Sequence, residues 1–424
     1  MKFETLTEIE FNNFAYKNPY SNFHQTPEWG KLKEKNGWIS HLLGVKKEDT
    51  IIAACLLLEK KVMKCFSLFY SPRGYLIDFH NEEILSFFTK EIKKYAKDRH
   101  GIFVKIDPYV LYKERDIDGN IKENGINNEK IVESLKKLGY KHTGFNLDHE
   151  NMQPRWAFAL DLKDKTEDDL LKNMEPKTRQ LIHKNERNHI TIREINEDEL
   201  NLFKDIMNHT SERRNFIDRP FNYYKNMLEV LKEHAKIYIA ELNIKELILK
   251  SKQEIEDNKK IIYSKQEEID TKKKNINIEK SLKKIKELEE TNLRLEKKVN
   301  HYEEILEKDG EIITLGGIIY MIYNQEILSL FGGSYDKYME FLSFYTIHWE
   351  MIKYALHNGY TKYNFYGISG DFQNKQNELY GIYDFKRGFG GHVEEYIGEF
   401  DFIINPLLYF LYKYGFQLYK KLKK

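Results

Sequence analysis

Apolar residues follow two different spacings along the first third of the chain. Short continuous or alternating apolar runs predict strands, whereas apolar positions three and four residues apart predict an amphipathic helix. The strand patterns cover residues 38–45, 51–58, 66–70 and 102–106, and the helical pattern covers residues 82–97. Strands that alternate with a helix in this way predict a mixed α/β domain.

A similar succession of patterns returns after Pro154. Its members are a strand at 156–162, helices at 167–185 and 197–213, strands at 235–242 and 312–323, a helix at 343–358 and a strand at 362–366. No sequence repeat links the two halves, so the order of elements is the evidence for two related domains. We predict a first domain of residues 1–152, completed by residues 396–424, and a second domain made of residues 153–242 and 311–395.

An insertion of a different character separates two strands of the second half. Residues 243–309 contain neither glycine nor proline, and Ile248, Ile255, Ile262, Ile269 and Ile276 recur every seven residues. Because the chain must return to the neighbouring strand, residues 243–310 predict an antiparallel two-helix coiled-coil arm. Limbs of about 30 residues give it a length of about 45 Å.

Six lysines are concentrated at the predicted tip of this arm, near residues 273–277. A solvated helix end is one interpretation of such a cluster, and contact with the phosphates of a nucleic acid is the other. The lysines are Lys272, Lys273, Lys274, Lys280, Lys283 and Lys284.

Composition limits the class of protein. With 41% hydrophobic residues the 424-residue chain can bury a large core, and its 68 basic and 67 acidic residues leave no net field toward nucleic acid or an anionic membrane. The amino terminus lacks a signal-peptide pattern, and no apolar run approaches the roughly 18 residues of a membrane-spanning helix. Cys55 and Cys65 lack the companion spacing of a zinc site. We therefore expect a cytoplasmic protein without a metal.

The carboxyl terminus predicts an amphipathic helix that starts at Asn405-Pro406, a cap followed by the residue that suits the first helical position. Residues 407–422 mix leucine and aromatic residues with lysines, and the chain ends in Lys423-Lys424. Such a helix is typical of a peripheral contact with an anionic membrane surface. The alternative is a helix packed on the first domain with its lysines in water.

Eight short motifs occur in order along nearly the whole chain. They are QTPEWGKLK at 25–33, YSPRG at 70–74, IDP at 106–108, DRPFNYY at 218–224, GGS at 332–334, FYGI at 365–368, DFKRGF at 384–389 and EYIGE at 395–399. Together with the inserted arm, they resemble the Fem ligase family of non-ribosomal aminoacyltransferases, which use aminoacyl-tRNA to build the interpeptide bridges of peptidoglycan precursors. The resemblance implies an α/β (α+β) fold with two GNAT-like acyltransferase domains and the coiled-coil arm.

The resemblance also implies where an acceptor substrate binds. Lys33 and Arg219 match positions that bind the precursor phosphates, with Tyr223 beside them as a hydrogen-bonding neighbour. The alternative for Lys33 is a solvated lysine on a helix. The alternative for Arg219, which precedes a proline in a predicted loop, is a structural ion pair.

Four further residues match the reacting centre of the family. Lys386 would stabilise the oxyanion of the tetrahedral intermediate or hold the terminal nucleotide of the donor, and Phe385 would stack on that nucleotide. Asp107 matches a proposed general base, and Glu399 matches another carboxylate of the substrate site. The alternative for Phe385 and Lys386 is a core phenylalanine beside a surface lysine, with Arg387 as the adjacent cation. The alternative for Asp107 is an Asp-Pro turn at a strand end, and that for Glu399 is a structural glutamate.

The donor is expected to be aminoacyl-tRNA without a cofactor. An enzyme of this fold that uses coenzyme A requires the turn Arg/Gln-x-x-Gly-x-Gly/Ala to bind pyrophosphate. The nearest match, residues 387–392, fails at its last position.

We therefore predict an enzyme that transfers Gly, Ala or Ser from aminoacyl-tRNA to the stem-peptide amine of a peptidoglycan precursor, in its lipid-linked form. Its expected partners are the tRNA, this precursor, the inner face of the cell membrane and other ligases of the same family. One alternative is a tRNA-dependent transferase that acts on protein amino termini. The other is a non-catalytic adaptor whose coiled coil recruits partners.

Overall fold

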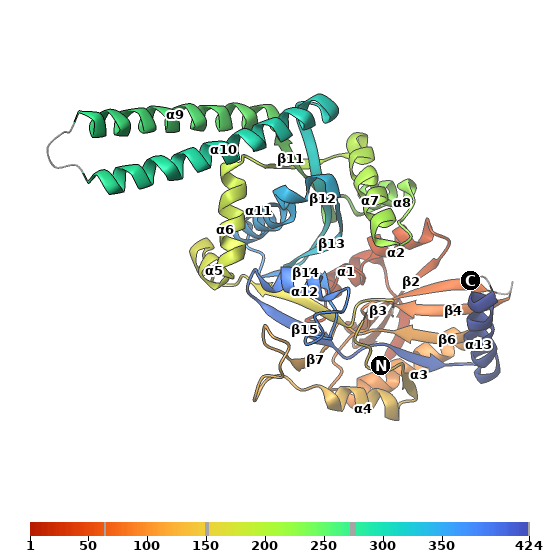
Figure 1. Ribbon diagram of the computed structural model, residues 1–424. Helices are drawn as coiled ribbons and strands as arrows, with labels where there is room; N and C mark the ends of the chain where they lie inside the picture. Colours follow the sequence, from red (N-terminus) through yellow and green to blue (C-terminus); the bar gives the residue numbers. More distant parts are fainter. Residues whose placement is uncertain (63–64, 149–151, 272–276, 423–424) are drawn as a thin grey trace.

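The computed structural model describes residues 1–62, 65–148, 152–271 and 277–422. Two sheets with their flanking helices form the body of the molecule, and a pair of long helices projects from one side (Figure 1). The first sheet has the order β1-β2-β3-β4-β6-β16-β8, with β5 beside β3. Its strands are β1 (Lys2–Thr5), β2 (Ile39–Lys47), β3 (Thr50–Val62), β4 (Phe66–Ser71), β5 (Leu76–Ile77), β6 (Gly101–Ile106), β8 (Tyr140–His142) and β16 (Phe400–Ile403).

The second sheet has the order β10-β11-β12-β13-β14-β9-β15-β7. Its strands are β7 (Leu111–Glu114), β9 (Trp156–Asp161), β10 (Thr191–Ile195), β11 (Ala235–Asn243), β12 (Ile312–Tyr323), β13 (Glu326–Ser334), β14 (Lys362–Gly367) and β15 (His392–Tyr396). Within each sheet one pair of neighbouring strands is parallel, β4 with β6 and β13 with β14. The C-terminal β16 lies in the first sheet and β7 lies in the second, so each sheet takes a strand from a distant part of the chain.

Helices cover both sheets. Those of the first part are α1 (Glu8–Lys17), α2 (Pro27–Glu34), α3 (Glu82–Lys97) and α4 (Glu129–Lys137). Those that follow are α5 (Glu167–Asn173), α6 (Pro176–Arg187), α7 (Leu200–Arg214), α8 (Phe221–Leu231), α11 (Ser343–His357), α12 (Tyr380–Arg387) and α13 (Pro406–Leu422), with 3-10 turns at Glu197–Glu199, Lys232–His234 and Asp336–Phe341. The prediction of one helix over residues 167–185 is wrong, because Pro176 cannot continue a helix and starts a new one.

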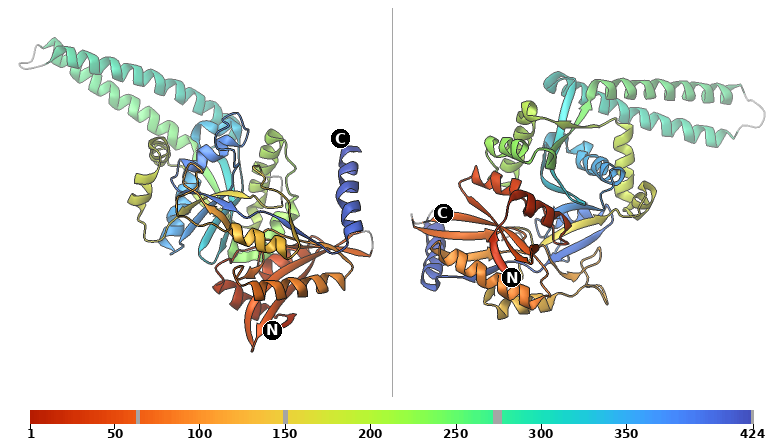
Figure 2. Two further views of the ribbon diagram at one scale, coloured as in Figure 1. Left: turned by 90° about the horizontal axis from the view of Figure 1, so that it is seen from below. Right: turned by 180° about the vertical axis from the view of Figure 1, so that it is seen from behind.

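The insertion folds as two long helices, α9 (Ile244–Asp270) and α10 (Ile278–Asp309), that lie side by side (Figures 1 and 2). Ile255, Ile285 and Val299 are buried along their contact. The side-chain amide of Asn258 donates to Asn292 Oδ1 across it at 2.8 Å. A polar pair in an apolar contact of this kind fixes the register of the two helices. The turn predicted near residues 273–277 falls almost wholly outside the described residues.

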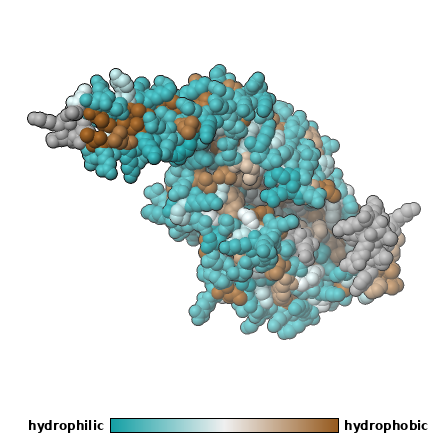
Figure 3. All heavy atoms as spheres, in the orientation of Figure 1, coloured by the Kyte–Doolittle hydropathy of each residue, from teal (hydrophilic) through white to brown (hydrophobic). Residues whose placement is uncertain are grey.

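The apolar stripe of the arm is not fully covered towards its far end. Ile261, Tyr263, Ile278 and Leu282 are exposed there. Figure 3 shows hydrophobic residues gathered near this end, while most of the visible surface is hydrophilic. The seven-residue repeat therefore predicts the helices correctly, although burial decreases along them.

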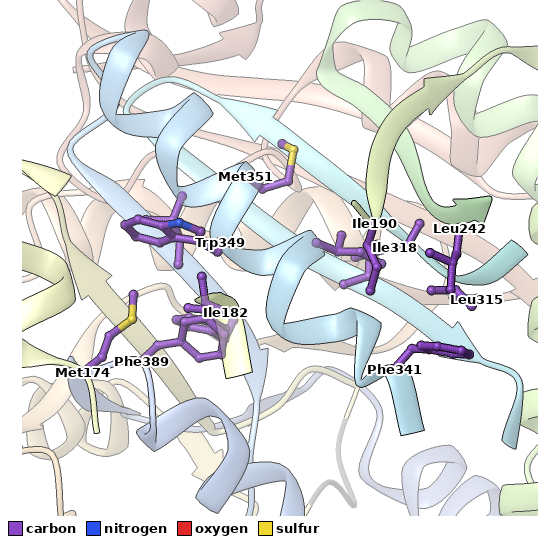
Figure 4. Close-up of a cluster of buried hydrophobic side chains, with 14 of the residues drawn as sticks. Met174, Ile182, Ile190, Leu242, Leu315, Ile318, Phe341, Trp349, Met351 and Phe389 are labelled. Atoms are coloured by element: carbon purple, nitrogen blue, oxygen red, sulfur yellow. The ribbon is translucent and has the colours of Figure 1, made fainter. Parts of the chain in front are cut away.

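One buried apolar cluster joins the two sheets. Leu32 of α2 and Leu56 of β3 belong to the same cluster as Tyr224 of α8 and Ile319 of β12. The buried residues of a second cluster all lie between Trp156 and Val393. Figure 4 shows part of this cluster, with Met174, Ile182 and Phe389 close together. The division into domains at the predicted residues stays a prediction. The shared cluster shows that the two sheets are packed against each other through an apolar contact.

Candidate functional site

Lys33, Arg219 and Tyr223 lie together, and we call them the Lys33 cluster. The Lys33 Nζ lies 4.3 Å from the centroid of the Trp29 ring and 5.8 Å from that of Tyr223, and the Arg219 guanidinium lies 5.4 Å from the same tyrosine ring. Helix α2 positions the lysine, because Thr26 accepts a hydrogen bond from Trp29 N at 3.1 Å and Pro27 occupies the first turn.

A short polar network holds the loop that carries Arg219. Tyr224 Oη donates to Asp218 Oδ1 at 2.6 Å, and Lys204 Nζ donates to the Arg219 carbonyl at 2.8 Å and also pairs with Asp218. The carboxylate of this loop is thereby occupied by other partners. The Arg219 side chain stays exposed beside the Tyr223 ring.

The Lys33 cluster has the electrostatics of an anion site. Burial and, to a smaller extent, the nearby Arg219 cation together lower the pKa of Lys33 to about 8. Among the described residues, no carboxylate forms a salt bridge with either cation. Two cations that share one aromatic side chain without a counter-ion repel each other, and a bound anion relieves that repulsion.

Asp107 follows the buried strand β6, and we call Asp107, Tyr70 and Arg73 the Asp107 cluster. The carboxylate is 2% exposed and accepts hydrogen bonds from Arg73 N at 2.7 Å and from Tyr70 Oη at 3.1 Å. Burial raises the pKa of Asp107, Arg73 opposes the rise and Glu399 adds to it, and the net pKa is about 7. A carboxyl group with a pKa near neutrality suits a general base better than an ordinary surface carboxylate does.

Glu399 is near this cluster but already has partners. Lys105 Nζ donates to Glu399 Oε2 at 2.8 Å and also pairs with Asp401 at the same distance. The other carboxylate oxygen accepts from Met152 N. These contacts tie β6, β16 and residue 152 together and favour the structural interpretation of Glu399. Its part in substrate binding stays a prediction.

Phe385 and Lys386 lie in the last turns of α12, and we call them the Lys386 pair. Lys386 is 8% exposed, and its Nζ donates to the carbonyls of Gly367 at 2.8 Å and Tyr366 at 3.3 Å. Burial lowers its pKa to about 7. Phe385 is half-buried, and its ring lies 4.9 Å from that of Tyr345 and 5.5 Å from that of His348. The alternative of a surface lysine in this motif is therefore wrong, because the end of β14 covers Lys386.

A row of contacts connects the Asp107 cluster with the Lys386 pair. The Arg73 guanidinium donates to the Pro154 carbonyl at 2.9 Å, and Pro154 lies so close to Gly367 that a Cβ there would be 3.0 Å from the proline Cβ. Gly367 in turn accepts the hydrogen bond from Lys386. The residues that the motifs place far apart in sequence are therefore linked through contacts between the two sheets.

Tyr366 connects the Lys33 cluster with this row of contacts. Burial raises its pKa, and Arg73, Asp107 and Tyr223 lie close enough to act on it. Its hydroxyl donates to Gln153 Oε1 at 2.6 Å, and its backbone adopts a positive φ of 67°. The Lys33 cluster, the Asp107 cluster and the Lys386 pair therefore each have a member near Tyr366.

Sequence reasoning missed Arg73 and Tyr366 as members of the site. Arg73 is 4% exposed, and its guanidinium lies 4.5 Å from the centroid of the Tyr396 ring. Both residues belong to motifs of the sequence, at positions 70–74 and 365–368. Arg73 comes two residues after β4 and Tyr366 lies at an irregularity of β14, and neither position marks a site residue in the sequence alone.

The lysines predicted at the arm tip are described only in part. Lys280, Lys283 and Lys284 are exposed in the first turns of α10, and Lys284 lies 3.8 Å from Glu287. Lys272, Lys273 and Lys274 lie outside the described residues. Contact of these lysines with nucleic acid stays a prediction.

A cavity of about 730 Å³ opens elsewhere, beside β7, β9 and β15. Leu111, Ile117 and Val393 line it together with Lys122 and His392. None of the site residues predicted from the sequence lines it. The candidate site is therefore defined by the three groups around Tyr366 and not by this cavity.

We expect Lys33→Ala and Arg219→Ala each to weaken binding of a phosphate-bearing acceptor, since the bound anion loses one of two cations. Binding by the unaltered chain should also weaken as the pH rises through about 8, where Lys33 loses its charge. Calorimetric titration of each protein with the phosphate-bearing acceptor between pH 6.5 and 9 measures both effects. Lys35→Ala is the matched control, because Lys35 pairs with Glu229 instead. Unchanged affinity in both cluster variants would remove the Lys33 cluster from the acceptor site.

Comparison with known proteins places this architecture in a class. The crystal structure of FemX superposes with a TM-score of 0.77 and 29% identity, covering 97% of this chain and 99% of that one. The fold is therefore that of a Fem-type protein with two α/β halves, as the resemblance implied.

The family itself follows from the sequence. The model of the FemAB family matches residues 6–416. Two relatives named aminoacyltransferase FemA, from Staphylococcus aureus strains MRSA252 and N315, are 35% and 34% identical over 414 residues, or 97% of both chains. The chain belongs to the FemAB family. The predicted enzyme class, an aminoacyltransferase of the Fem type, is thereby confirmed.

Proposed function

We propose that this chain transfers an amino acid from aminoacyl-tRNA to the stem-peptide amine of a lipid-linked peptidoglycan precursor during interpeptide-bridge synthesis. The observation that carries the proposal is the meeting of three groups around Tyr366. An anion site, a carboxyl group with a pKa near 7 and a buried lysine beside an aromatic ring lie at the contact of the two sheets. These are the parts that acyl transfer between two phosphate-bearing substrates requires.

The reaction needs no covalent enzyme intermediate. The acceptor amine attacks the carbonyl carbon of the aminoacyl ester, forming a C–N bond and a tetrahedral oxyanion. Asp107 takes a proton from the attacking amine, and the Lys386 ammonium stabilises the oxyanion. The C–O bond to the tRNA ribose then breaks, and the leaving ribose oxygen receives the proton that Asp107 took from the amine. Lys33 and Arg219 hold the acceptor phosphates, so that the amine is delivered near Asp107.

The glycine-rich turn after α12 supports a donor other than coenzyme A. A side chain at Gly390 would come within 2.7 Å of the Asn173 carbonyl oxygen, and one at Gly391 would clash with the Ala159 carbonyl. These glycines allow the turn to pack closely against the chain's own backbone. Both glycines also line the cavity beside β7, β9 and β15, so a donor other than coenzyme A is inferred from the sequence pattern, which fails at the last position of residues 387–392.

The proposed function is tested by transfer itself. The pure protein is incubated with a lipid-linked precursor and, in turn, with radiolabelled glycyl-, alanyl- and seryl-tRNA, and the labelled product is separated. We expect one label to move to the precursor, and this label identifies the amino acid. Label transfer to a protein amino terminus instead would favour the alternative transferase. No transfer from any aminoacyl-tRNA would overturn the proposal.

A lipid-linked acceptor requires the enzyme to work at the membrane surface, and α13 is the proposed contact. No helix among the described residues is long and apolar enough to cross a bilayer. Tyr409 packs against Phe103 at a ring distance of 5.3 Å, so the helix starts on the first sheet. Leu407, Phe410 and Leu411 are nevertheless exposed on it. The chain carries no acidic residue after Asp401.

We expect modest, salt-sensitive binding to anionic vesicles that falls when the four last lysines are replaced by glutamine. The residues are Lys420, Lys421, Lys423 and Lys424. Sedimentation with phosphatidylglycerol vesicles measures the binding, and vesicles of neutral lipid are the control. Equal binding by both proteins, or none by either, would contradict the membrane contact.

A further inference from the structure

Helix α6 presents a row of cations to solvent. Its twelve residues include four that are basic and one that is acidic. Three of the basic side chains are exposed at spacings of seven and three residues, which place them on one face of a helix. We call Lys177, Lys184 and Arg187 the α6 row. The opposite face is buried through Thr178, Ile182 and Asn185.

The fold makes little use of the α6 row. Among the described residues, no carboxylate forms a salt bridge with any of its three members. The fourth basic residue of α6 is engaged, since Arg179 donates to three carbonyls at the end of α5, and His183 lies 3.0 Å from Glu186. Three solvated cations in line are a ready contact for a chain of phosphates.

The two ends of α6 give the row its direction. At the start, Glu175 N donates to the Gly388 carbonyl at 2.9 Å and Arg387 pairs with Glu175, so α6 begins beside the Lys386 pair. At the other end the chain enters β10, which pairs with β11, the strand that leads into α9. Helix α6 therefore spans about 18 Å from the Lys386 pair towards the base of the arm (Figure 1).

The row is also held rigidly. Asn185 Nδ2 donates to Thr346 Oγ1 of α11 at 3.0 Å. Ile182 lies with Met174 and Phe389 in the buried cluster (Figure 4). Cations on a fixed helix lose less conformational freedom on binding than cations on a loop would.

We propose that the α6 row binds the sugar–phosphate backbone of the donor RNA, at the stem adjoining its aminoacylated 3′ end. The inference rests on the proposed function, which puts that end at the Lys386 pair. A duplex that leaves the pair along α6 meets the three cations in succession. Phosphate contacts position an RNA without reading its bases, so the row serves any tRNA that carries the correct amino acid.

The test uses the triple variant Lys177→Gln, Lys184→Gln, Arg187→Gln. The matched control is Lys90→Gln, Lys94→Gln, Lys97→Gln, three exposed lysines at spacings of four and three residues on α3. Glutamine is a good helix former, so both helices should remain folded. For each protein, KM is measured with whole aminoacyl-tRNA and with a short aminoacylated oligonucleotide that ends at the unpaired 3′ nucleotides.

We expect KM for whole tRNA to rise about tenfold or more in the α6 variant. The slope of log affinity against log salt concentration should become shallower by about 2 to 3. KM for the short donor should stay unchanged, and so should both values in the control. Unchanged KM for whole tRNA, an equal rise in the control or an equal rise with the short donor would overturn the proposal.

Two further outcomes distinguish this inference from the proposed function and from binding of lipid. If the unaltered protein transfers nothing, the proposed function fails, and binding of labelled tRNA by the same three proteins still decides whether the row contacts RNA. If the α6 variant loses binding to anionic vesicles and keeps its affinity for tRNA, the row serves lipid and the RNA proposal is wrong.

Discussion

Replacing Lys386 by methionine is expected to lower the rate of transfer by about two to three orders of magnitude, the loss typical of one oxyanion donor. The fold should persist, because methionine fills a similar volume and removes a charge that burial disfavours. Single-turnover transfer with both substrates at saturation measures the effect, and circular dichroism checks the fold. Near-normal turnover by a folded variant would exclude Lys386 from the reaction.

The neighbouring cation supplies the control for this experiment. Arg387 follows Lys386 in sequence, but its guanidinium pairs with Asp118 and Glu175 at the surface. Arg387→Met should therefore change transfer far less than Lys386→Met. A greater loss in Arg387→Met would assign the catalytic charge to the arginine.

The regular elements of the fold were predictable because their signals are local. The apolar run at residues 102–106 lies in β6, and the seven-residue isoleucine repeat from Ile248 to Ile269 lies in α9. The pairing of β7 with β15 was not predictable, because it joins residues nearly three hundred positions apart and β7 has only four residues. Pro176 signals the break between α5 and α6 in the sequence, although the apolar pattern of residues 167–185 predicts one helix.

The residue types of the site were predictable from the sequence, but the burial and contacts of these residues were not. The motifs contain Lys386, Asp107 and Lys33, yet their pKa values depend on burial that only the packed sheets create. Arg73 acquires its role through Asp107, 34 residues away, and Pro154, 81 residues away. A residue of this kind is recognised from contacts, because neither its spacing nor its neighbours in sequence distinguish it from a surface arginine.

Replacing Asp107 by asparagine tests the base, and here we expect a loss of about two to four orders of magnitude in kcat/KM. The Oδ1 of asparagine can still accept the hydrogen bond from Arg73 N, and its Nδ2 can donate to Tyr70 Oη, so the cluster should keep its geometry. Unlike the carboxylate, it cannot take the proton of the attacking amine. A folded Asp107→Asn protein with ordinary activity would exclude the base, and Glu399→Gln then becomes the variant to measure.

The pH dependence separates the two roles. Asp107 must be ionised, so activity should rise as the pH passes its pKa of about 7, and Lys386 must be charged, so activity should fall as the pH passes a similar value. The unaltered enzyme should therefore show a narrow bell-shaped profile of kcat/KM with its maximum near pH 7. Lys386→Arg keeps the charge at all these pH values, so its alkaline limb should move to about pH 8, where Lys33 loses its charge, while the acid limb stays in place. An alkaline limb that stays near pH 7 in Lys386→Arg would mean that the lysine does not act through its charge.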